Sequence, residues 1–115
     1  GAKETIDGEN YEGWVFKDSG VESVIIPSTL KRLEISTFWK CNSLASIVIP
    51  NGVEQIGNNC FWCSGVEQIT LPNTLRKIDK DAFICCIRLK TVWVEKDCPF
   101  DIGKYVGRRV EVQKK

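Results

Sequence analysis

The chain of 115 residues contains neither histidine nor methionine. The missing histidine removes the commonest general base and the usual catalytic triads. No apolar run approaches the roughly 20 residues that span a bilayer, so we expect no direct membrane insertion. An excess of one charge is also lacking, since 16 Lys and Arg offset 15 Asp and Glu. Because phosphate binding needs a local excess of Lys and Arg, this balance argues against a nucleic-acid partner.

What is present is typical of a folded chain, with 43% hydrophobic and 27% charged residues. The length favours one folding unit, so we expect residues 1–115 to form a single domain. The N-terminus shows no secretory signal and opens on Gly1-Ala2. We therefore expect either a cytosolic protein or a trimmed segment of a longer one.

A repeat of 22 or 23 residues runs through the chain. Three copies carry an apolar alternation that ends at a proline: Val24-Ile25-Ile26-Pro27, Ile47-Val48-Ile49-Pro50 and Ile69-Thr70-Leu71-Pro72. A phenylalanine follows at the same distance from each proline, at Phe38, Phe61 and Phe83. We assign 1–20 to an N-terminal cap and half-repeat, 21–43, 44–65 and 66–88 to repeats, and 89–115 to a terminal repeat and C-terminal cap.

The alternation predicts one short strand per repeat. The few apolar side chains on one face of such a strand cannot form a core by themselves. Stacked coils would bury a continuous core and pair the strands in parallel. Proline ends each strand because it lacks the N–H that a ladder needs. A second, shorter strand is expected after each proline. Residues 35–41, 57–63 and 79–86 are expected to form short helical or 3₁₀ returns that place each phenylalanine in the core.

The repeated positions of these apolar residues, prolines and phenylalanines resemble the BspA-like class of leucine-rich repeats, found in bacterial and protist surface proteins. The fullest match is Ala82-Phe83-Ile84-Cys85-Cys86-Ile87-Arg88-Leu89. The resemblance implies an α/β repeat fold, a right-handed leucine-rich-repeat solenoid of about four to five coils. It also implies a secreted or cell-surface location and the binding of other proteins. Thr29, Gly52 and Thr74 occupy the position where commoner leucine-rich repeats carry asparagine, so no asparagine ladder is expected.

The six cysteines allow three interpretations. They fill tight apolar corners, which is the interpretation we favour. Alternatively, Cys63 and Cys85 share a column of neighbouring coils and could form a disulfide. Zinc binding or redox chemistry at Cys60 and Cys63, which have CxxC spacing, would need ligands such as Cys85 and Cys86 one coil later. We expect no metal and no cofactor.

Two surfaces are candidates for binding. Alternation turns a row of largely apolar residues outward on the strand face, beside a more polar row: Ile25, Val48, Thr70 and Trp93, then Ser23, Ser46, Gln68 and Thr91. Exposed apolar patches often mark partner sites, and tryptophan is enriched at interaction hot spots. The second surface is a flank column directly after the core phenylalanines: Trp39, Trp62 and Ile84. These rings could instead fold back and seal the coil.

The sequence therefore predicts a non-enzymatic protein–protein interaction module that binds an unidentified protein partner through the strand face or the tryptophan flank. The alternative is a structural spacer, a segment of a longer surface repeat protein with no ligand of its own. The sequence does not indicate an oligomeric state.

Overall fold

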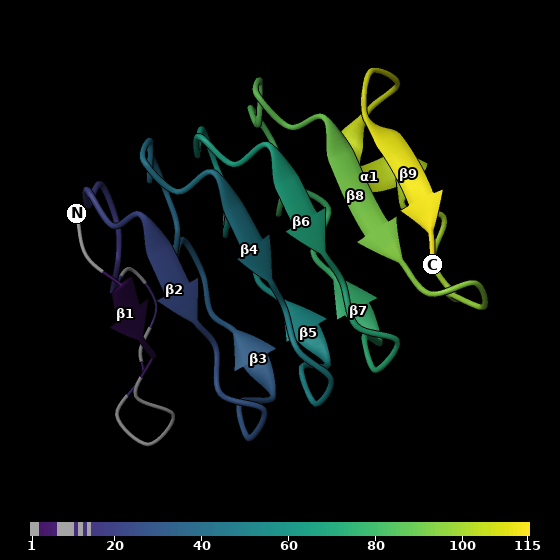
Figure 1. Ribbon diagram of the computed structural model, residues 1–115, viewed down its shortest axis with the longest axis horizontal. Coiled ribbons are helices and arrows are strands. Elements are labelled where there is room, and N and C mark those ends of the chain that lie inside the picture. The colour runs from purple at the N-terminus through teal and green to yellow at the C-terminus, as the bar shows by residue number, and fades with distance from the viewer. Residues whose placement is uncertain (1–2, 7–10, 12, 14) are drawn as a thin grey trace.

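The computed structural model describes residues 3–6, 11, 13 and 15–115. Over these residues the chain makes about five turns of a parallel β-solenoid (Figure 1). Each repeat contributes one strand to a first ladder: β2 (Ser23–Ile25), β4 (Ser46–Val48), β6 (Gln68–Thr70) and β8 (Thr91–Val94). The predicted solenoid with parallel strands on one face is therefore confirmed.

The register of the first ladder matches the sequence period. Ile47 pairs with Ile69, and Ile69 pairs with Val92. All three side chains are buried, because they point to the inner face of their strands. Pro50 and Pro72 lie two residues beyond paired positions of β4 and β6, so these prolines fall in one row.

The ladder extends beyond the repeats at both ends of the molecule. β1 (Lys3–Thr5) pairs in parallel with β2, and β9 (Glu111–Lys114) pairs in parallel with β8. The alternation of Val110 and Val112 in the sequence predicts such a closing strand at the C-terminus, and it is present. β2 and β4 lie next to each other but share no hydrogen-bonded ladder, so the first ladder is divided into β1–β2 and β4–β6–β8–β9.

A second ladder follows the prolines, as predicted. It consists of β3 (Arg32–Leu33), β5 (Gln55–Ile56) and β7 (Lys77–Ile78). Its inward residues Leu33, Ile56 and Ile78 are paired in register and buried. Figure 1 shows the two ladders at different levels of each coil.

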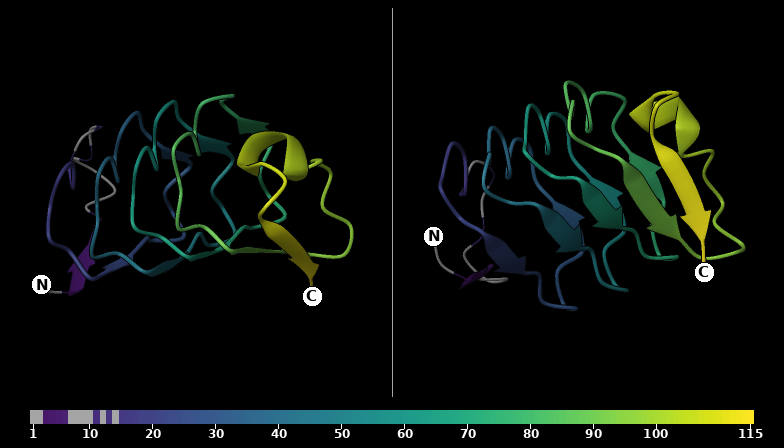
Figure 2. Two further views of the ribbon diagram at one scale, coloured as in Figure 1. Left: turned by 90° about the horizontal axis from the view of Figure 1, so that it is seen from above. Right: turned by 45° about the horizontal axis from the view of Figure 1, so that its top comes forward.

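The returns between coils are successive turns, where short helical or 3₁₀ segments were expected. The backbone of Ser36 and Lys40 has positive φ, 56° at each, and such left-handed residues interrupt a right-handed helix. Lys40 N–H donates a 2.8 Å hydrogen bond to the Trp62 carbonyl of the next coil. In the described residues the one helix is α1 (Gly103–Val106), which lies at the C-terminal end (Figure 2).

The phenylalanines form a continuous column inside the returns. Phe16, Phe38, Phe61 and Phe83 stack with centroid separations of 5.9, 5.1 and 5.4 Å. Phe38 and Phe61 are completely buried. Each stacked pair contributes roughly 0.5–1.5 kcal/mol beyond the burial of its surface. The half-repeat before residue 21 therefore joins the core through Phe16.

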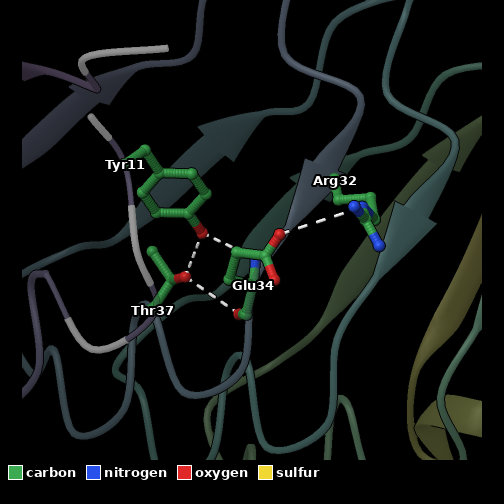
Figure 3. Close-up of polar contacts among 4 residues, drawn as sticks. All are labelled: Tyr11, Arg32, Glu34 and Thr37. Atoms are coloured by element: carbon green, nitrogen blue, oxygen red, sulfur yellow. Dashed lines mark hydrogen bonds and ion pairs between the residues drawn. The ribbon is translucent and has the colours of Figure 1, made fainter. Parts of the chain in front are cut away.

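Hydrogen bonds of Tyr11 connect it to the segment that begins directly after β3 of the second ladder (Figure 3). Its hydroxyl accepts a 2.6 Å hydrogen bond from Glu34 N–H and donates to Thr37 Oγ1. Thr37 Oγ1 donates in turn to the Glu34 carbonyl at 2.9 Å. Arg32 Nε lies 3.9 Å from the Glu34 carboxylate at the open side of this network. Burial raises the pKa of Tyr11 well above its ordinary value, so the hydroxyl stays protonated and can donate.

Replacing Tyr11 by phenylalanine tests the contribution of these hydrogen bonds to stability. Tyr11→Phe leaves Glu34 N–H without its acceptor and removes the hydrogen bond that Thr37 Oγ1 accepts, so we expect a loss of about 1–3 kcal/mol in the free energy of unfolding. Urea unfolding measures the loss. Tyr105→Phe is the matched control, because Tyr105 makes an edge contact with Phe100 through its ring, and it should be nearly neutral. Equal losses in the two variants would contradict the role of the Tyr11 hydroxyl.

Neighbouring residues of β4 test the inward and outward assignment. Ile47 is 4% exposed and Val48 is 63% exposed. Ile47→Asp places a carboxylate in the core and should cost at least about 4 kcal/mol, enough to unfold a marginal chain. Val48→Asp should change stability by less than about 1 kcal/mol. Thermal unfolding followed by circular dichroism compares them, and similar melting temperatures would refute the assignment.

Candidate functional site

The strand face presents the predicted apolar row outward. Ile25 is 44% exposed and Val48 is 63% exposed, while Thr70 and Trp93 are half-buried. The strand register holds three of them in line, because Val48 pairs with Thr70 and Thr70 pairs with Trp93. The row is therefore a continuous feature of the β4–β6–β8 sheet, and Ile25 continues it across the break to β2.

The break in the ladder forms a groove in this face. The groove has a volume of about 380 Å³ and lies between β2 and β4. Ser23, Ile25, Ser46 and Val48 line it from the two strands. Two exposed aliphatic side chains thus stand beside an opening between strands that do not pair with each other.

The second row on the strand face is polar. Ser23, Ser46 and Gln68 are exposed, and Thr91 is half-buried. Gln68 Oε1 accepts a 3.1 Å hydrogen bond from Trp93 Nε1, which fixes the indole ring against the face. The structure therefore brings the eight predicted strand-face residues onto one surface.

The outer strands of this surface were not among the predicted site residues. Thr5 pairs with Ile25, and Gln113 pairs with Trp93, so β1 and β9 lengthen both rows. The alternation of Val110 and Val112 is a signal for β9. The sequence of β1 has no proline or phenylalanine that aligns with the repeat.

The tryptophan flank is a stacked ridge. The rings of Trp39 and Trp62 are 4.8 Å apart at an angle of 11°, and both residues are half-buried. Lys40 Nζ lies 4.8 Å from the Trp39 ring centroid and 5.7 Å from that of Trp62, and Lys17 Nζ lies 4.8 Å from Trp39. Ile84 follows one coil later and is 44% exposed. Sequence analysis did not identify the two lysines, which use part of the ring surface for cation–π contacts.

Cys41 and Cys60 lie within the core, and Cys86 and Cys98 pack against it. Cys60 is completely buried, and burial raises the pKa of its thiol. Burial also raises the pKa of Cys41 to about 11 and that of Cys86 to about 12. The Cys41 and Cys86 thiols donate hydrogen bonds to the carbonyls of Phe16 and Phe61. These protonated groups fill corners and are poor nucleophiles, because thiolate is the reactive form.

Cys63 and Cys85 lie together on adjacent coils. Burial and the nearby Cys85 thiol raise the pKa of the Cys63 thiol. Both residues have positive φ, 52° and 60°. In the structure all six cysteines are free thiols, so the disulfide stays a prediction. In the described residues no group of three or more metal-ligating side chains comes together, and Cys60 points into the core while Cys63 reaches the surface.

Oxidised glutathione tests the Cys63–Cys85 disulfide. Two successive thiol exchanges would join the sulfurs, and one glutathione disulfide would be reduced to two glutathiones. We expect a cross-linked peptide pair in non-reducing mass spectrometry, which Cys85→Ser abolishes. Half-buried Cys98 is the control and should not join Cys63. Separate glutathione adducts on Cys63 and Cys85, with no cross-link, would show that the pair cannot close.

The geometry defines a repeat protein of the parallel β-solenoid class. The sequence profile of the BspA type leucine rich repeat region matches residues 10–106 in six copies, and the chain belongs to this family. The family suggests a protein-interaction or repeat module, is generally non-enzymatic and is associated with surface proteins. The chain has no match among the curated proteins or the solved structures that were searched. Among the described residues, no helix has the length and apolar character to cross a membrane.

Proposed function

We propose that the chain is a non-enzymatic protein-interaction module of a surface or secreted protein, and that its partner docks on the strand face. The observation that supports this is the outward, largely apolar row of Ile25, Val48, Thr70 and Trp93, of which the strand register keeps the last three in line. An aligned row is a larger target than the scattered hydrophobic residues of an ordinary surface.

The groove between β2 and β4 supplies a place for a partner's apolar side chain. Ile25 and Val48 start 44% and 63% exposed, so burying the rest of each side chain would contribute roughly 1–2 kcal/mol. Trp93, held by Gln68, adds a pre-oriented ring of the kind enriched at hot spots. Ser23 and Ser46 provide a polar rim for hydrogen bonds. Binding of this kind depends on surface complementarity and requires no chemical step.

The tryptophan flank is the second candidate surface, supported by the stacked pair Trp39 and Trp62. We rank it below the strand face because both rings are half-buried and Lys17 and Lys40 lie over them. A partner would have to displace those lysines or contact the ring edges. The strand face requires no such rearrangement.

A capture experiment with two double variants tests the proposal. The immobilised chain is exposed to extracts of cell-surface proteins, and captured proteins are quantified by mass spectrometry. Val48→Asp with Trp93→Ser should reduce capture at least about tenfold while circular dichroism shows that the chain stays folded, because it places a charge in the apolar row and removes the indole. Trp39→Ser with Trp62→Ser should retain capture.

The other outcomes decide against the strand face. Capture lost only in the Trp39 and Trp62 variant would assign binding to the flank. If the unmodified chain retains no protein above an unrelated solenoid of similar charge, the spacer interpretation holds and the interaction proposal is wrong.

A further inference from the structure

A cleft of about 900 Å³ lies at the C-terminal end of the solenoid, away from the strand face. One wall is the last return and the segment after it, residues 83–90, and the other is the cap, residues 105–110. The cap contains α1, which lies at this end of the molecule (Figure 2). In the described chain no further phenylalanine stacks on Phe83, and α1 and β9 follow β8 at this end.

The backbone of the last return is left with open donors. In earlier coils, Phe38 N–H donates to the Cys60 carbonyl at 2.8 Å, and Phe61 N–H donates to the Ala82 carbonyl at 2.9 Å. The equivalent N–H of Phe83 has no acceptor among the described residues. Since each of these bonds points toward the following coil, the Phe83 N–H points into the cleft that replaces that coil.

A second donor lies two residues further along. Lys40 N–H donates to the Trp62 carbonyl and Cys63 N–H donates to the Ile84 carbonyl, whereas Cys85 N–H has no acceptor in the described chain. Phe83 and Cys85 both line the cleft. The two open N–H groups are therefore two residues apart. In the earlier coils, N–H groups with this spacing donate to the carbonyls of two alternate residues in the neighbouring peptide segment.

The side chains of the cleft are mainly cationic and apolar. Arg88, Arg108 and Arg109 are exposed there, and the one carboxylate in the lining, Glu67, lies 3.1 Å from Lys90 Nζ. The arginines thus leave an excess of positive charge in a chain whose net charge is only +1. Two isoleucines add apolar surface, Ile84 with 44% exposure and Ile87 with 79% exposure.

We propose that this cleft binds an acidic peptide segment of a partner protein in place of the missing coil. Peptide carbonyls accept hydrogen bonds from Phe83 N–H and Cys85 N–H, in the manner of backbone augmentation. Carboxylates of the segment pair with Arg88, Arg108 and Arg109, and its apolar side chains cover Ile84 and Ile87. The exposed isoleucines and the peptide-like donor spacing favour this occupant over a nucleic acid, which would use the arginines alone.

This site is separate from the strand face and does not depend on it. It recognises charge and backbone, whereas the strand face offers a neutral apolar row. A partner could use either surface alone or both at once, since none of the eight strand-face residues lines the cleft.

The probe is a short, end-blocked peptide in which glutamate alternates with leucine, titrated against the isotope-labelled chain. We expect saturable binding by fluorescence anisotropy, with amide resonances of Phe83 and Cys85 among those that shift most. Arg88→Glu with Arg108→Glu should weaken binding about tenfold or more, because both cationic partners are reversed. The matched control is Arg76→Glu, an exposed arginine outside the cleft, which should bind as the unmodified chain does.

Several results would overturn the proposal. The first is a lack of saturable binding of the peptide, and the second is that Arg76→Glu weakens binding as much as the Arg88 and Arg108 double variant does. The third is that resonance shifts are confined to residues of the strand face. The fourth is that single-stranded RNA displaces the peptide at a lower concentration than the peptide itself requires. The Val48→Asp, Trp93→Ser variant should still bind the peptide. That variant separates failure of the cleft from failure of the strand-face proposal.

Discussion

The stacking of each coil on the next is the interaction on which this structure depends. One coil has too few apolar residues to bury its own edge, and the edge is covered only by the equivalent residues of its neighbour. Phe38 therefore stacks on Phe61, and Ile47 pairs with Ile69, so that each covers the equivalent residue of the neighbouring coil. Turn amides that donate to the next coil reinforce it, so the returns are fixed by their neighbours as much as by their own sequence.

The same constraint explains why the candidate sites lie where they do. A strand that alternates must turn half of its side chains outward, so a regular inner column produces a regular outer row such as Val48, Thr70 and Trp93. Openings form where hydrogen bonding between neighbouring coils is missing. The groove between β2 and β4 lies within the stack, and the cleft beyond Phe83 lies at its end.

Residues governed by the period could be predicted from the sequence, and those governed by local geometry could not. The inward and outward positions of Ile47 and Val48 follow from alternation, and the burial of Phe61 follows from its column. The prediction of helical returns was wrong because the backbone has positive φ at Lys40 and Cys63. Lysine and cysteine are not residue types that indicate positive φ in a sequence. The cleft could not be predicted, since it depends on the path that the backbone takes after β8. The disulfide and the binding role of the strand face remain predictions.

The central claim is that each coil completes the hydrogen bonding of the coil before it. Hydrogen–deuterium exchange of individual amides, measured by NMR on the unliganded chain, tests this most directly. The account predicts slow exchange at Phe38 and Phe61, whose amides donate to the following coil, and much faster exchange at Phe83, whose amide faces the cleft. Equally slow exchange at Phe83, or equally fast exchange at Phe38 and Phe61, would contradict it.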